Sequence, residues 1–142
     1  MMRWIGAGLV GLWLTCIPLS PVAADYVTEE GPCAHKARCW SFSANVWHVE
    51  GESEALNQGR AFHLDGKEDR VTGVVHPGDQ RAELVVEVWD EGYRLLRRRV
   101  VHAYKAKPFT VPLKELGSRP VHIFLYFQQG GQKACVTGQL YY

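Results

Sequence analysis

The sequence predicts an all-β protein, a single antiparallel β-sandwich of about seven short strands. From residue 39 onward, apolar residues recur with a period of two, which is the period of a strand and not of a helix. Stretches rich in glycine, proline and aspartate separate these alternating segments and indicate turns. Residues 25–142 are enough to bury one modest core, so we expect one domain.

The first half of the chain contains two predicted strands. Residues 39–46 place Trp40, Phe42 and other apolar side chains on one face and mainly polar side chains on the other, as in a half-buried strand. Residues 50–70 are polar and contain glycine, which is typical of loops. Within that stretch, only residues 61–64 are apolar enough to form a strand.

The next two predicted strands are residues 71–75 and 82–88. The turn signal at residues 77–79 lies between them and predicts that they form a hairpin. Along the second strand, Leu84 and its alternate neighbours point toward the core, while Glu87 belongs to the opposite face.

The remaining segments complete the sandwich. Three consecutive arginines interrupt the alternation in residues 93–104, which predicts an irregular or bulged edge strand. A proline places the strand at residues 109–113 at a sheet edge or marks the end of that strand, and a short helical turn is expected at 113–116. Residues 121–127 are apolar on both faces and therefore predict a central strand. Residues 134–142 close the domain.

The first 24 residues predict an export signal. Arg3 precedes an apolar stretch that is too short for a membrane anchor. Val22 and Ala24 are the small residues expected before a signal peptidase cut, which would fall before Asp25. The expected organisation is a signal peptide (1–24), an N-terminal segment (25–38) and the β-sandwich domain (39–142).

Cys16 permits a second interpretation of the same segment, a lipoprotein signal in which this cysteine becomes the acylated N-terminus. The short charged start and the position of the cysteine favour lipidation. Trp13 and Thr15 count against it, because a leucine and a small residue are usual at these positions. Both alternatives place the mature protein outside the cytoplasm.

An oxidising compartment favours disulfide pairing among Cys33, Cys39 and Cys135. Cys33 and Cys39 flank a short segment that closes easily, so we favour this pair. A Cys39–Cys135 bond is the rival, and it requires the first and last strands to be neighbours. Either pairing leaves one cysteine over, which permits a covalent dimer.

Catalytic and metal sites are not predicted. Once Arg3 has left with the signal, basic and acidic side chains are equal in number, which argues against a nucleic-acid binder. Zinc held by Cys33, Cys39, His35 and His48 is a weaker alternative to the disulfide. We expect no enzyme activity, no metal and no cofactor.

Three residues are candidates for contact with a partner. Trp89 shares a strand face with Glu87, which makes it a candidate exposed contact. Arg97 and Arg99 can pair with carboxylates of a partner, although arginines on an edge strand also prevent sheet-to-sheet aggregation, and we give that protective role more weight.

Several motifs in the second half of the chain carry a resemblance to a known family. They are a Val-Thr-Gly-Val strand at 71–74, the alternating strand at 82–90, the segment Pro-Phe-Thr-Val-Pro-Leu at 108–113 and a closing pair of apolar strands. This half of the chain resembles the small β-sandwich lipoproteins that serve type III secretion systems as pilotins or secretin chaperones, and within them the exoenzyme S synthesis protein B-like group. The segment at 108–113 is the most specific of these motifs.

The resemblance implies a non-enzymatic protein at the periplasmic face of the outer membrane, or in the periplasm, whose partner is the outer-membrane secretin. Lipidation in that family maps onto Cys16, where this sequence departs from the usual lipoprotein signal. An exposed edge at residues 95–104 can add a strand or clamp a peptide of the secretin.

Two other functions stay open. One is a periplasmic or secreted module that binds a sugar or a peptide, which exposed Trp47 and Trp89 would support. The other is a small hydrolase, which no spacing of acidic, serine or histidine residues supports.

Overall fold

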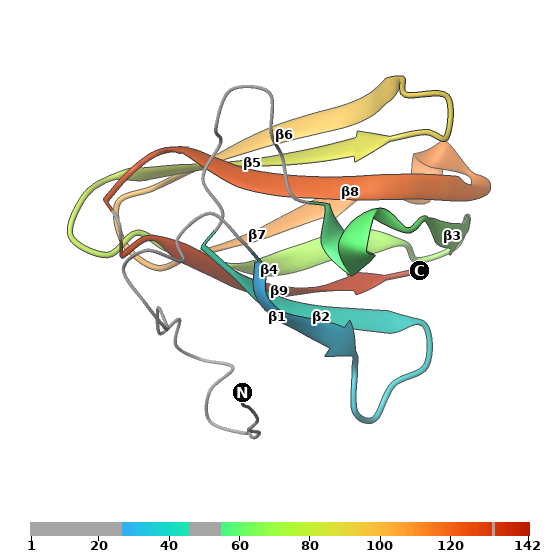
Figure 1. Ribbon diagram of the computed structural model, residues 1–142, viewed down its shortest axis with the longest axis horizontal. Coiled ribbons are helices and arrows are strands. Elements are labelled where there is room, and N and C mark those ends of the chain that lie inside the picture. The colour runs from blue at the N-terminus through green and yellow to red at the C-terminus, as the bar shows by residue number, and fades with distance from the viewer. Residues whose placement is uncertain (1–26, 46–54, 132) are drawn as a thin grey trace.

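Two antiparallel β-sheets pack face to face in the computed structural model (Figure 1), which describes residues 27–45, 55–131 and 133–142. The described residues form the strands β1 (Val27–Pro32), β2 (Cys39–Ala44), β3 (Phe62–Asp65), β4 (Arg70–His76), β5 (Ala82–Trp89), β6 (Leu95–Ala103), β7 (Lys107–Pro112), β8 (Ser118–Gln129) and β9 (Cys135–Tyr141). One sheet has the order β1-β2-β9-β4-β7 and the other β3-β8-β5-β6. The predicted all-β sandwich is confirmed.

The core lies between the sheets and follows the alternation of the sequence. On β5, the side chains of Ala82, Leu84, Val86 and Val88 are completely buried. Successive side chains on a strand point to opposite faces, so Glu83, Glu87 and Trp89 lie on the outer face of the same sheet. Phe42, Phe127, Ile123, Leu125 and Leu140 are among the largest buried side chains from the other strands.

The predicted places of the later segments are confirmed. β8 is central, between β3 and β5, and β6 and β7 are the edge strands of their sheets. The pairing of β5 with β6 shifts register between Val88 and Trp89, which is the expected bulge. The helical turn is the 3₁₀ helix η3 (Lys114–Leu116). No helix of the described residues is long and apolar enough to cross a membrane.

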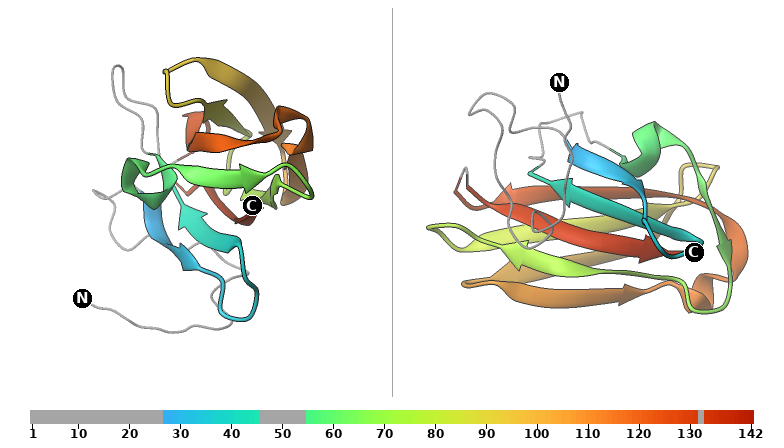
Figure 2. Two further views of the ribbon diagram at one scale, coloured as in Figure 1. Left: turned by 90° about the vertical axis from the view of Figure 1, so that its right-hand side faces the viewer. Right: turned by 90° about the horizontal axis from the view of Figure 1, so that it is seen from below.

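The predicted hairpin between residues 71–75 and 82–88 is wrong. β4 pairs with β9 and β7 in one sheet, while β5 pairs with β8 and β6 in the other, so the turn after β4 carries the chain across the sandwich. A turn signal shows that the chain reverses but does not say which strand becomes the neighbour. The two views of Figure 2 show the two layers from other sides.

β1 was not predicted by the sequence pattern. It lies within the expected N-terminal segment at 25–38 and forms an edge of the five-stranded sheet by pairing with β2. Its sequence, Val-Thr-Glu-Glu-Gly-Pro, has no apolar alternation from which a strand could be read.

Glu30 of β1 accepts hydrogen bonds from two other parts of the fold. One oxygen of its carboxylate accepts a hydrogen bond from Trp40 Nε1 at 2.8 Å and another from the backbone N–H of Asn57 at 2.6 Å. Asn57 belongs to the 3₁₀ segment η2 (Leu56–Gly59), which lies beside β1 and β8 (Figure 2). Asn57 and Gln58 both have left-handed φ angles, at 60° and 55°. Asparagine tolerates this region but glutamine does so less readily, so the carboxylate helps to hold a backbone shape that is costly at Gln58.

Candidate functional site

A hollow of about 290 Å³ opens on the outer face of the four-stranded sheet. Of the described residues, those that line it come from β5, β8, η2 and the turn between β5 and β6: Gly59, Glu87, Trp89, Tyr93, His122 and Phe124. The side chains are mainly aromatic, with one carboxylate and one imidazole. This is the composition of a binding site with apolar walls and a few orienting polar groups.

Strand register brings the central residues of the hollow together. Glu87 lies opposite Phe124, and Trp89 lies opposite His122, so all four side chains project from the same face of the sheet. The Trp89 ring meets the Phe124 ring edge to face, with centroids 6.5 Å apart and an interplanar angle of 76°. This arrangement of rings is a favourable one and holds the indole in place.

Glu87 is the polar centre of this face. Its Oε1 accepts a hydrogen bond from Trp89 Nε1 at 3.0 Å, and its Oε2 accepts one from the Tyr126 hydroxyl at 2.9 Å. The guanidinium of Arg98 lies 3.3 Å from the same Oε2. Burial, together with the neighbouring Glu87 carboxylate, raises the pKa of Tyr126, so its hydroxyl stays a donor at neutral pH. The Glu87 carboxylate is therefore fixed from three sides.

His122 lines the hollow, and Glu91 lies against His122. His122 Nε2 is within hydrogen-bonding distance of Glu91 Oε1. The His122 side chain is 20% exposed and that of Glu91 is 58% exposed, so the carboxylate stands at the solvent boundary.

The turn that carries Tyr93 is held by Asp90. Its Oδ1 accepts hydrogen bonds from the backbone N–H groups of Gly92 at 2.9 Å and Arg94 at 2.8 Å. Tyr93 has a left-handed φ of 62°, and its side chain is among the most exposed of the large apolar ones. The Asp90 hydrogen bonds therefore hold the one wall of the hollow that lies on a turn.

The lowered pKa of Asp90 predicts that the stability of the protein depends on pH. The backbone hydrogen bond from Arg94 is the main cause that lowers the pKa of Asp90 below its usual value. Because the folded-state pKa is the lower one, this carboxylate contributes stability above the unfolded pKa of about 3.9, and the contribution is lost as the pH falls through the folded value. Replacing Asp90 with asparagine is expected to destabilise the protein more at pH 7 than at pH 2.5. Urea unfolding of both proteins at the two pH values measures this, and an equal loss at both would contradict it.

The structure separates the three predicted contact residues. Trp89 lines the hollow and is half buried. Arg97 and Arg99 lie opposite Val88 and Val86, which are core residues, so their side chains leave β6 toward the other sheet. The Arg97 guanidinium donates to the carbonyl oxygen of Pro112 and pairs with Glu115 at 3.0 Å.

These arginines cover the free edges of β6 and β7. Arg99 donates to the carbonyl oxygen of Thr110 at 3.4 Å, as Arg97 does to that of Pro112. β7 also contains Pro108 and Pro112, which have no backbone N–H to offer to another strand. Inward-pointing charges and edge prolines are devices that oppose edge-to-edge pairing.

Replacing Arg97 and Arg99 together with serine is therefore expected to increase self-association. Because the Glu115 end of the ion pair is exposed, the free energy of unfolding should change little. Light scattering over a range of protein concentrations measures the association. The double variant Lys67→Ser/Lys105→Ser removes the same charge from exposed turns and serves as the control. Equal scattering from the two variants would argue against edge protection.

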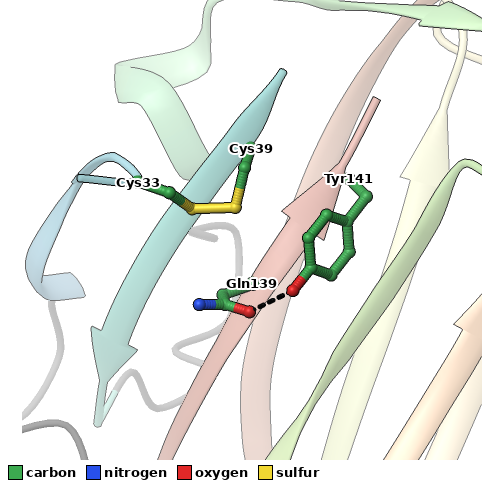
Figure 3. Close-up of a disulfide and its surroundings, with 4 residues drawn as sticks. All are labelled: Cys33, Cys39, Gln139 and Tyr141. Carbon is green, nitrogen blue, oxygen red and sulfur yellow. Dashed lines mark hydrogen bonds between the residues drawn. A yellow bond between two sulfur atoms is a disulfide. The ribbon is translucent and has the colours of Figure 1, made fainter. Parts of the chain in front are cut away.

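The predicted Cys33–Cys39 disulfide is confirmed. It closes the turn between β1 and β2, and its Cα atoms are 5.3 Å apart (Figure 3). The rival Cys39–Cys135 pairing is therefore wrong. Cys135 is also disulfide-bonded, so no cysteine in the described part of the full chain is free. A disulfide of this kind is typical of proteins that fold in an oxidising, exported environment.

The zinc alternative is excluded at this turn, because the sulfur atoms of Cys33 and Cys39 are bonded to each other. In the part of the chain that the structure describes, no group of three or more histidine, cysteine, aspartate or glutamate side chains is placed to hold a metal ion. His48, Trp47, Cys16 and the predicted signal lie outside the described residues.

Sequence reasoning found Trp89 but not the residues around it. His122 and Phe124 lie on a strand whose apolar residues occupy both faces, so the pattern did not show which of them face outward. Tyr93 and Glu91 belong to a turn whose residues are mostly polar. The usable signal was the aromatic residue in that turn, next to a glycine and close to Trp89 in sequence.

Comparison of the chain with protein-family models, with curated proteins and with solved structures found no match.

Proposed function

We propose that this protein is an exported accessory protein without catalytic activity, which acts as a pilotin or chaperone for the outer-membrane secretin of a type III secretion system. The hollow beside Trp89 is the observation that carries the proposal, because it offers a partner a concave, aromatic surface on a rigid sheet. The disulfide supports export. The resemblance of residues 71–142 to secretin chaperones supplies the class of partner.

The segment most specific to that resemblance does not form the proposed contact surface. Residues 108–113 include most of β7, where Pro108 and Pro112 remove donors from an exposed edge. This role is structural. We therefore place the contact with the secretin on the outer face of the other sheet, at the hollow.

Acylation or removal of Cys16 determines whether the protein is anchored at the membrane. If it is acylated, the protein is held at the periplasmic face of the outer membrane, since each buried methylene contributes about 0.8 kcal/mol and several chains together give stable anchoring. If the signal is instead cut before Asp25, the same binding surface acts in the periplasm.

Deleting the gene in the native host tests the proposal. We expect fewer secretin multimers in the outer-membrane fraction, restored by a plasmid copy of the full chain. Intact mass of the exported protein shows whether it begins at Cys16 with acyl groups or at Asp25. Normal secretin assembly in the deletion strain would contradict the proposed function, whichever N-terminus is found.

A second candidate, a module that binds a sugar or a peptide, is favoured by the half-exposed Trp89 ring in the hollow. Aromatic faces that stand beside polar groups bind the apolar side of a sugar ring or of a side chain. The same deletion strain separates the two candidates, because a module of this kind leaves secretin assembly unchanged.

A further inference from the structure

We infer that the hollow beside Trp89 receives a basic side chain from a partner peptide, arginine in preference to lysine. The inference rests on the proposed function for the identity of the partner. The residues of the hollow indicate the chemistry of the ligand.

The walls of the hollow suit a cation. Trp89, Tyr93 and Phe124 present three aromatic rings around one small space. The face of an aromatic ring attracts a cation within about 6 Å, and tryptophan does so most strongly. A guanidinium is planar and weakly hydrated, so it stacks on such rings more readily than an ammonium group does.

The charges around the hollow also favour a cation. No lysine or arginine is among the described residues that line it. Arg98 balances Glu87 from the side of β6. Glu91, which contacts His122, adds a second carboxylate whose side chain is 58% exposed. The described charged groups at the hollow and beside His122 are therefore carboxylates, which favour an incoming cation over an anion.

The hydrogen-bonding groups of the hollow favour a cation over a sugar as its ligand. Sugar hydroxyls require both donors and acceptors, yet Trp89 Nε1 and the Tyr126 hydroxyl already donate to Glu87. An acceptor that remains beside the hollow is the exposed Glu91 carboxylate, which contacts His122 Nε2 through Oε1. A guanidinium has only donors, in a fork that matches a carboxylate.

The size and rigidity of the hollow fit a single side chain. Its volume of about 290 Å³ is at the lower end for ligand sites, which begin at roughly 300 Å³. The Trp89 ring is already fixed by Glu87 and Phe124. Little conformational freedom is therefore lost when a side chain enters.

Binding of two blocked tripeptides tests the inference. One is acetyl-Gly-Arg-Gly-amide, and the other has citrulline, which is neutral and nearly the same shape, in place of arginine. The mature protein labelled with ¹⁵N is titrated with each peptide, and the Trp89 indole N–H signal is followed by NMR. We expect the arginine peptide to shift this signal and to bind at least about tenfold more tightly than the citrulline peptide, a difference of about 1.4 kcal/mol.

Two variants place the effect at the hollow without disturbing the core. Glu91→Gln, at an exposed side chain, should weaken binding of the arginine peptide about threefold. Tyr93→Asn removes one wall and keeps a residue that tolerates the left-handed φ, so it should weaken binding as well. Glu68→Gln, at an exposed carboxylate on the turn after β3, is the control and should bind like the unchanged protein.

Equal binding of the arginine and citrulline peptides would overturn the inference, as would the absence of any shift with the arginine peptide at millimolar concentration. A shift of the Trp89 signal by methyl glucoside but not by the arginine peptide would assign the hollow to sugars instead. These outcomes concern the hollow alone. The deletion strain tests the secretin function separately, so either proposal can fail while the other stands.

Discussion

Replacing Gly138 with alanine is expected to lower the free energy of unfolding by about 3 kcal/mol, at the upper end of what overpacking costs. Gly138 of β9 lies opposite Gly73 of β4, and the two backbones pass very close together. A Cβ at Gly138 would collide with the carbonyl oxygen of Thr72 and would lie 2.8 Å from the Phe42 ring. Neither neighbour can retreat, because one is strand backbone and the other is a buried core ring.

Gly31→Ala is the matched control for this prediction. Gly31 is also a strand glycine, but a Cβ built there has no atom within 4 Å. Its replacement should leave stability unchanged or raise it slightly, because alanine restricts the unfolded chain. Urea unfolding of both variants measures the difference. A loss at Gly138 no larger than that at Gly31 would mean that the two sheet strands can separate without cost.

The close approach at Gly138 also shows what sequence reasoning missed. The alternation of residues 82–88 predicted the inward and outward faces of β5 correctly, because that pattern depends only on neighbours along the chain. The partner of β4 depends instead on contacts distant in sequence, such as Gly73 with Gly138. The turn signal at residues 77–79 carries no information about those distant contacts. The predicted hairpin was therefore wrong.

The candidate site, like the fold, was predictable only where a pattern along one strand was enough. Trp89 could be chosen because its strand showed clear alternation, and the edge position of Arg97 followed from the interrupted pattern around it. The other walls of the hollow depend on the register between β5 and β8, which pairs Trp89 with His122. Register is set by the packed core as a whole, so no local pattern names these residues.

Removing the Cys33–Cys39 disulfide is expected to lower the free energy of unfolding by about 2 kcal/mol, the cost predicted for the loss of a small closed loop. The replacement is Cys33→Ser with Cys39→Ala, because Cys39 is buried and a hydroxyl there would need a partner. Since the bond fastens β1 to β2, we also expect the hydrogen bond from Asn57 to Glu30 of β1 to open more often. Hydrogen exchange at the Asn57 amide should therefore become faster in the variant.

The design of this experiment follows from the other cysteine. Adding a reductant to the unchanged protein does not isolate the Cys33–Cys39 bond, because Cys135 is not free either. The double variant removes this one bond and leaves Cys135 as it is. A loss below about 0.5 kcal/mol would show that the turn is already held by its hydrogen bonds, which include that from the Cys33 N–H to the Cys39 carbonyl at 2.9 Å. Faster exchange at Asn57 without a change at Leu84 in the core would instead show that the disulfide acts through β1 on η2, which carries Gly59 of the hollow.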